Sequence, residues 1–298
     1  MEDDRERLRA LFHPWDVPEP EAVQRGLAEI PAVAIADFVL DDEEAPGHRA
    51  TCAEALVGRV PAERAAALID LACSSRGHSH APIGTSLVAA LNTGRPFRNA
   101  LRAMALERND FYVAEDLGSW DLLDDAKAGD AQALGVLTVL ASAPWDYMRE
   151  EGEHAIELLI ELRGLPAVLA MLGAGSPEEL ARSGAYPAHR LLGLRLLWRA
   201  DGDITFCLGD DSAVVSEAAY ELLAGGRGDD GALTAMAEEG RPGYLWALAL
   251  LHQRGHDIRP LWELLGPPQV EVLAVPPEVW EVIVRGIRGS GATARHDV

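Results

Sequence analysis

The sequence contains few cysteines, a single lysine and no long apolar run. Cys52, Cys73 and Cys207 are widely spaced and form no CxxC pair, which argues against a disulfide framework and a four-ligand zinc site. The longest apolar runs, such as residues 245–251, fall far short of the roughly 20 residues that a membrane-spanning helix needs. Lys127 stands beside 25 arginines and abundant alanine, which indicates the codon bias of a GC-rich, bacterial genome.

Positive charge is scarce along the whole chain. Across 298 residues, 26 Lys and Arg face 48 Asp and Glu, so the formal net charge is −22. Hydrophobic residues make up 48% and charged residues 25%, which is typical of a folded, soluble protein. The amino-terminal sequence MEDDRERLRALF is acidic where a secretory signal would be basic. We therefore expect a cytoplasmic protein without a membrane partner.

The negative charge is unevenly distributed. Residues 1–50, 101–150 and 201–250 are strongly acidic, whereas residues 51–100 are mildly basic. A nucleic-acid-binding protein normally presents a basic stripe to the phosphate backbone, so nucleic acid is an unfavoured partner. An acidic surface attracts basic proteins and amines, although high net charge also simply keeps a protein dispersed.

Strand-like alternation is nearly absent, and apolar residues recur at helical spacing between short Gly, Pro, Asp and Ser breaks. The spacing predicts nineteen short helices, from residues 2–12 to residues 277–288. Short helices joined by short breaks pack antiparallel to their sequence neighbours. The predicted fold class is therefore all-α, with tryptophans expected in the core at positions Trp145, Trp198, Trp246, Trp262 and Trp280.

The segment 208–223, LGDDSAVVSEAAYELL, combines a capping Asp or Ser with an apolar stripe that includes Val214, Val215 and small alanines. This segment resembles the second helix of a HEAT or armadillo-type repeat, and residues 130–143, 187–200 and 242–254 show a similar pattern. The resemblance covers residues 130–266 and implies a right-handed α-solenoid with a concave binding face. We expect an irregular helical region at 1–129, HEAT-like repeats at 130–288 and a flexible tail at 289–298.

The polar window 73–86 is the first candidate site, because its loop is rich in side-chain donors and leads into a helix. Free backbone amides at that helix start, with basic and hydroxyl side chains nearby, favour an anion such as phosphate or carboxylate. A plain connection between repeats is the alternative interpretation. The candidate residues of this window and of the helix after it are Arg76, His78, His80, Thr85, Ser86, Arg95 and Arg98.

The second candidate site is the stretch 107–125, where carboxylates alternate with aromatic residues. Such a wall favours an ammonium or guanidinium group through ion pairing and cation–π attraction. In an enzyme, one carboxylate could also deprotonate an amine. A connection with buried aromatics and solvated acids is the alternative. The candidate residues are Asp110, Tyr112, Glu115, Asp116 and Trp120, with Glu115, Asp116 and His78 as the candidate catalytic groups.

Other familiar sites are not indicated. His252 and His256 lie four residues apart, but Gly255 is expected to end their helix and no HExxH glutamate accompanies them. His78 and His80 have no third ligand in register. No phosphate-binding glycine motif or nucleophile elbow follows a strand. We therefore expect neither a metal nor a cofactor.

Two functions fit these features. The first is an acidic helical-repeat module that recognises a basic protein or peptide, as an adaptor, inhibitor or immunity-type protein does. The second is an enzyme or accessory protein of bacterial specialised small-molecule biosynthesis, which would hold a cationic, amine-bearing substrate in the groove. A third resemblance, to helical-repeat DNA glycosylases, is disfavoured because a basic groove is expected for that family.

Overall fold

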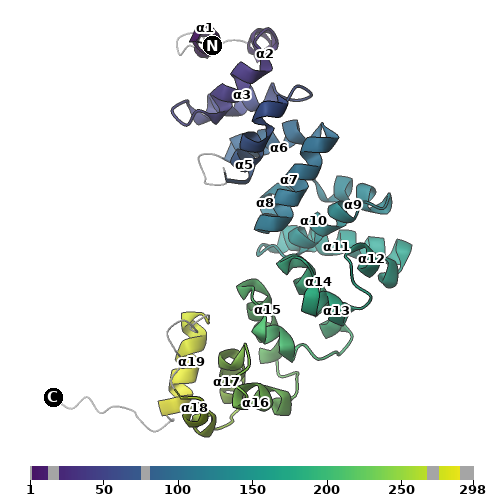
Figure 1. Ribbon diagram of the computed structural model, residues 1–298, viewed down its shortest axis with the longest axis vertical. Coiled ribbons are helices and arrows are strands. Elements are labelled where there is room, and N and C mark those ends of the chain that lie inside the picture. Colours follow the sequence, from purple (N-terminus) through teal and green to yellow (C-terminus); the bar gives the residue numbers. More distant parts are fainter. Residues whose placement is uncertain (1, 13–19, 75–80, 267–274, 289–298) are drawn as a thin grey trace, which may run out of the picture. The chain divides into compact units, whose positions relative to one another are not determined.

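The computed structural model describes residues 2–12, 20–74, 81–266 and 275–288. Within these ranges every regular element is a helix, so the prediction of an all-α chain is confirmed (Figure 1). The chain divides into two compact units, Met1–Leu172 (unit 1) and Gly173–Val298 (unit 2). The predicted boundary at residues 129/130 concerns the regularity of the repeats and stays a prediction. The predicted tail at 289–298 lies outside the described residues.

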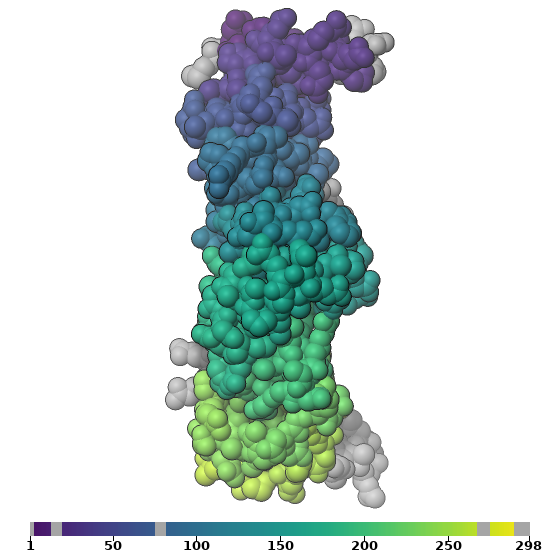
Figure 2. All heavy atoms as spheres, turned by 90° about the vertical axis from the view of Figure 1, so that its right-hand side faces the viewer, coloured from purple at the N-terminus to yellow at the C-terminus, as the bar shows by residue number. Residues whose placement is uncertain are grey.

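Unit 1 is built from short helices in which neighbours along the chain pack on one another, and its segments follow in chain order in the space-filling view (Figure 2). Several helix starts carry the expected caps; Asp130, for example, accepts hydrogen bonds from the amides of Gln132 and Ala133. The elements are α1 (Glu2–Leu11), α2 (Pro20–Ala28), α3 (Ala32–Leu40), α4 (Pro46–Glu54), η1 (Ala62–Arg64), α5 (Ala65–Ser74), α6 (Ala81–Asn92), α7 (Arg95–Arg108), α8 (Phe111–Asp116), α9 (Ser119–Lys127), α10 (Ala131–Ala141), α11 (Asp146–Arg163) and α12 (Leu165–Met171).

Unit 2 continues the same style of construction. Its first helix begins with Ser176, whose hydroxyl accepts a hydrogen bond from the amide of Glu179, and Pro177 occupies the first helical position. The elements are α13 (Pro177–Ser183), α14 (Pro187–Arg199), η2 (Thr205–Gly209), α15 (Ala213–Ala224), α16 (Asp230–Glu238), α17 (Tyr244–Gln253), α18 (Arg259–Leu265) and α19 (Pro277–Arg288).

In each unit, one helix that is apolar on all sides is covered by its neighbouring helices. In unit 1, residues 133–141 of α10 are all buried, and the helix packs against α7, α8, α9 and α11. In unit 2, residues 245–251 of α17 are all buried, and the helix packs against α15, α16, α19 and η2. A helix without a polar face is stable only when neighbours cover its whole circumference. These two helices therefore anchor their units.

In each unit, one glycine permits a close contact between two helices. A Cβ added to Gly152 of α11 would lie 2.4 Å from the backbone nitrogen of Ala141, and one added to Gly193 of α14 would lie 2.4 Å from that of Ala181. Any side chain at these two positions would push the paired helices apart.

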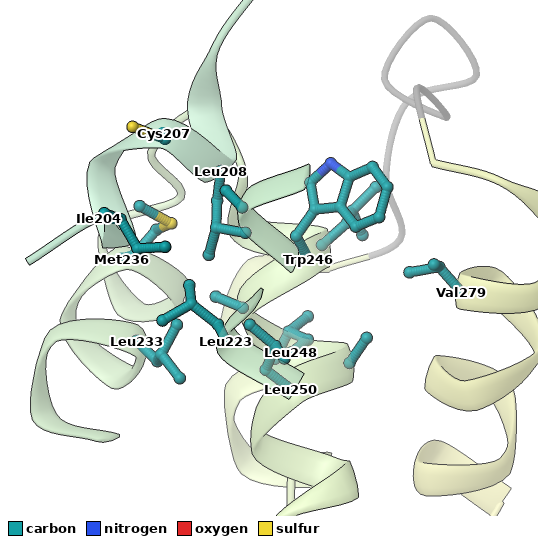
Figure 3. Close-up of a cluster of buried hydrophobic side chains, with 14 of the residues drawn as sticks. Ile204, Cys207, Leu208, Leu223, Leu233, Met236, Trp246, Leu248, Leu250 and Val279 are labelled. Atoms are coloured by element: carbon teal, nitrogen blue, oxygen red, sulfur yellow. The ribbon is translucent and has the colours of Figure 1, made fainter. Parts of the chain in front are cut away.

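The core of unit 2 confirms part of the expected helix stripe. Val215 is fully buried on α15, whereas Val214, which the sequence pattern placed on the same stripe, is 43% exposed. Trp246 packs among the leucines of α17 and is 4% exposed, as expected (Figure 3). The core position expected for Trp145 is wrong, because 39% of this residue is exposed.

Within the described ranges, no helix combines the length and the apolar character that crossing a lipid bilayer requires. The same ranges contain no group of three or more His, Cys, Asp and Glu side chains placed to bind a metal ion.

Candidate functional site

The two candidate windows of the sequence meet in unit 1. Helix α6 packs against α8, and the hydroxyl of Thr85 donates a hydrogen bond to Asp116 Oδ1 across 3.4 Å. One exposed residue of the first window thus touches a carboxylate of the second. Ser86 follows Thr85 on α6 and is half-buried. Arg76, His78 and His80 lie outside the described residues.

The two candidate arginines after the first window, Arg95 and Arg98, lie at the start of α7. Arg98 Nε donates a hydrogen bond to the carbonyl oxygen of Asn92, and its Nη1 lies 3.6 Å from Asp125 Oδ2. Arg98 therefore joins the start of α7 to the end of α6 and to α9. Arg95 is exposed at the first residue of α7.

Helix α8 carries the carboxylates and aromatic residues of the second window. It begins at Asp110, whose Oδ1 accepts a hydrogen bond from the amide of Val113. Asp110 thus caps the helix, which gives it a structural role. Glu115 and Asp116 occupy the last turn and are half-buried, while Val113 and Ala114 hold the helix to the core.

Aromatic rings from α8 and from the start of α11 form one cluster. Trp145 lies 4.9 Å from Phe111 and 5.1 Å from Tyr112, measured between ring centroids. Tyr147 extends the cluster toward the carboxylates, because its hydroxyl is hydrogen-bonded to Glu115. Partial burial and the negative charge of Glu115 raise the pKa of Tyr147, so this phenol stays protonated and donates.

Trp120 forms a separate pocket on the same unit. Its ring is 62% exposed and meets His154 edge-on at 6.3 Å. Together with Ser119, Glu151 and Ala155, these residues line a hollow of about 40 Å³. Glu151 accepts a hydrogen bond from the hydroxyl of Ser119 at 3.3 Å. The hollow is large enough for a single small group, such as one ammonium or methyl group, beside a carboxylate.

Residues 110–157 carry twelve Asp and Glu and two Lys and Arg. We call the patch formed by Thr85, Tyr112, Glu115, Asp116, Trp120, Trp145, Tyr147 and Glu151 the acidic aromatic surface. The sequence reasoning missed Trp145, Tyr147 and Glu151. The signal was present in the stretch PWDYMREE at 144–151, which places two aromatic residues beside acidic ones at a helix start.

The thiols have no place at this surface. Cys52, Cys73 and Cys207 are buried, and desolvation raises the pKa of both Cys52 and Cys207 to about 12. A buried, protonated thiol is a poor nucleophile and a poor metal ligand.

In comparisons with known proteins, no protein-family model, no curated protein and no solved structure matches the chain.

Proposed function

We propose that this protein is an acidic helical-repeat binding module of the cytoplasm that captures a basic protein or peptide, as an adaptor, inhibitor or immunity-type protein does. In this proposal the helices form a right-handed, HEAT-like array, and the acidic aromatic surface of unit 1 is the contact face. Arginine or lysine side chains of the partner lie over Trp145, Tyr147 and Trp120.

One observation carries the proposal: exposed aromatic rings and carboxylates occupy the same surface. Trp145 and Tyr147 are 39% and 57% exposed, and the Tyr147 hydroxyl contacts Glu115. A guanidinium group gains both from stacking on an aromatic ring and from a charged hydrogen bond to a carboxylate. A surface shaped only by the need for solubility would keep its carboxylates exposed and its aromatic rings covered.

The small hollow at Trp120 supports the same partner. A lysine ammonium group entering it meets the Trp120 ring, Glu151 and His154. The aromatic cluster at Trp145 is a second contact for the same chain. A peptide with several basic residues can thus bind at more than one position, which raises the overall affinity.

An amine-processing enzyme is less well supported. It needs an enclosed pocket of roughly 300 Å³ or more around the candidate carboxylates. The hollow that Trp120 lines holds about 40 Å³, and Glu115 and Asp116 are engaged by the hydroxyls of Tyr147 and Thr85. These contacts fit a surface that binds side chains of a partner better than they fit an enclosed active site.

The proposal is tested with a fluorescent peptide of alternating arginine and glycine, and with a matched peptide in which glutamate replaces arginine. Anisotropy should show binding of the arginine peptide alone, and raising the NaCl concentration should weaken it because salt screens exposed charges. The double variant Glu115→Gln, Asp116→Asn should lower the affinity about tenfold.

The control is the double variant Glu217→Gln, Glu221→Gln on α15, which removes the same charge from exposed positions of unit 2. It should change the affinity less than twofold. Equal effects of the two double variants would show that only net charge matters and would refute the contact face. Binding that is indifferent to salt would refute the electrostatic basis of recognition.

A further inference from the structure

A cavity of about 640 Å³ lies within unit 2. Its walls come from the end of η2, the first turns of α15 and α17, and the turn between α16 and α17. Cavities of 300–1,000 Å³ accommodate small organic molecules. The lining residues that matter most for its chemistry are Leu208, Asp211, Ala213, Arg241, Tyr244 and Trp246.

Two glycines bring these walls together. A Cβ on Gly209 would lie 2.5 Å from the carbonyl oxygen of Pro242, and a Cβ on Gly243 would lie 2.5 Å from the carbonyl carbon of Leu208. Gly243 also has a φ of +89°, a backbone conformation that residues with a side chain rarely adopt. The segments 208–209 and 242–243 therefore touch backbone to backbone. This contact sets the first turns of α15 and α17 around one cavity.

The cavity wall is apolar and aromatic. Trp246 is 4% exposed and packs against Tyr220 with their ring centroids 5.0 Å apart, which holds the indole in place. Figure 3 shows Trp246 next to Leu208 at the edge of the buried cluster. Tyr244 is half-buried, and desolvation raises the pKa of its hydroxyl, so it stays neutral. A flat or ring-bearing ligand gains from contact with this wall.

Among the charged groups next to the cavity, two carboxylates share one guanidinium group. Arg190 donates to both oxygens of Asp210, at 2.8 and 2.9 Å, and its Nη2 also lies 2.5 Å from Asp211 Oδ1. One guanidinium group thus faces two carboxylates. Asp210 is nearly buried with a side-chain exposure of 8%, whereas the Asp211 side chain is 89% exposed at the cavity rim.

Arg241, which also lines the cavity, is balanced by its own partner. Arg241 Nε lies 2.9 Å from Glu239 Oε2, so this pair adds no net charge. Residues 201–250 carry ten acidic and two basic side chains, and their field favours a cation over an anion.

We propose that this cavity binds a small molecule with an apolar, ring-bearing body and a protonated amine. The body lies against Trp246 and Tyr244, and the ammonium group donates to the carboxylate of Asp211. The site is independent of the proposed peptide-binding function, because it belongs to unit 2 and shares no residue with the acidic aromatic surface.

The test uses calorimetric titration of the full chain with three probes that share one body: 4-phenylbutylamine, 4-phenylbutanol and 4-phenylbutyrate. The amine should bind about fivefold or more tightly than the alcohol, because a charged hydrogen bond is stronger than a neutral one. The carboxylate should bind most weakly. Equal binding of all three probes, tighter binding of the carboxylate, or no binding of the amine overturns the proposal.

Variants locate the binding. Ala213→Phe fills the cavity from an exposed position and should abolish amine binding, whereas Val214→Phe, at the adjacent exposed position outside the lining, should leave it unchanged. Melting temperatures of both variants establish that they are folded. If the two variants bind the amine equally well, the molecule sits elsewhere and the proposal fails.

A second pair of variants isolates the charge. Asp211→Asn should weaken amine binding about fivefold and leave the alcohol unaffected, since only the ammonium group uses the charge. Glu217→Gln makes the same charge change on α15 away from the lining and should have no effect. The double variant Glu115→Gln, Asp116→Asn should also keep full amine binding. A loss in that variant would move the amine to unit 1 and refute this site.

Discussion

The two units place similar residues in opposite settings. In unit 1, rings from α8 and α11 gather on an open face beside Glu115, and Trp145 and Tyr147 are exposed. In unit 2, Trp246 is buried against Tyr220 and borders a cavity of about 640 Å³. Acidic and aromatic residues thus line an exposed surface with a small hollow in one unit and a larger, partly open cavity in the other. Backbone contact at Gly209 and Gly243 accounts for the difference, because it brings two helix starts around one space.

Arginine shows the same contrast. Arg102 in unit 1 is buried, but the carboxylates that it holds, Asp125 and Asp130, are 35% and 37% exposed. Arg190 in unit 2 holds Asp210, whose side chain is 8% exposed. Each of these two guanidinium groups contacts two carboxylates. The consequence of losing one depends on whether the carboxylate left behind can reach water.

The largest effect is expected from Arg190→Met. It leaves Asp210 nearly buried without its guanidinium, and we expect unfolding to become about 3–4 kcal/mol easier. Arg102→Met leaves carboxylates that water can solvate, and its cost should be about 1 kcal/mol. Urea denaturation followed by circular dichroism gives both values. Equal costs would mean that carboxylate burial does not separate the two units.

The next-largest effect is expected from alanine at Gly152 and Gly193, the two glycines of the close helix contacts. Gly152→Ala and Gly193→Ala should each destabilise their unit by about 2–3 kcal/mol, because the clash with backbone outweighs the helix propensity gained. Gly47→Ala is the control, since a Cβ there meets nothing within 4 Å, and it should be neutral or slightly stabilising. Hydrogen exchange read by mass spectrometry assigns each loss to its unit. If Gly152→Ala lowers stability and Gly193→Ala does not, the close backbone contact limits the side chain in unit 1 alone, and the two helix pairs are not equivalent.

Acid should destabilise unit 2 before unit 1 through His189. This residue is 6% exposed, and neither of its ring nitrogens has a hydrogen-bond partner among the described residues. Burial, followed by the charge of Arg190, lowers its pKa from 6.5 to about 4. The unfolded chain therefore binds a proton that the folded chain excludes, so stability is complete above pH 6.5 and falls as the pH drops toward 4. We expect a loss of about 2 kcal/mol between pH 7 and pH 5.

In unit 1 the corresponding group is Glu44. Burial opposes its ionisation, but hydrogen bonds from Arg9 and Arg5 lower its pKa below 4.5, so its contribution is lost only in stronger acid. Hydrogen exchange at pH 5.5 should thus show unit 2 opening before unit 1. The variant His189→Leu should flatten the pH dependence of unit 2 above pH 5. If the stability of unit 2 depends on pH as steeply in this variant as in the unchanged protein, His189 is not the cause of the pH dependence.

Much of the fold was predictable from local pattern. Apolar spacing at 3.6 residues predicted most of the helices, but not α8 (Phe111–Asp116). Caps such as Asp130 and Ser176 mark helix starts because short polar side chains satisfy free amides. The exposure of Val214 and Trp145 was not predictable. A helix stripe shows which residues can be buried, but only the neighbouring helices decide which of them are.

The candidate site was predictable in part for the same reason. Glu115, Asp116 and Tyr112 were recognised because they are close in the chain. Tyr147 joins them from α11, more than thirty residues later, and no local spacing indicates that contact. The unit 2 cavity was missed altogether, since Gly209 and Gly243 read as ordinary turn residues until their backbones meet.

The smallest expected effect sharpens the contrast between surface and core aromatics. Trp145→Leu removes a ring that is 39% exposed, so stability should change by less than about 1 kcal/mol. Affinity for the arginine peptide should still fall about threefold, the value of one partly solvated cation–π contact. Trp246→Leu should show the reverse pattern, with a loss of roughly 3 kcal/mol in stability and unchanged peptide affinity in the folded fraction. If Trp145→Leu binds the peptide normally, this ring is exposed for some other reason and the recognition rests on the carboxylates alone.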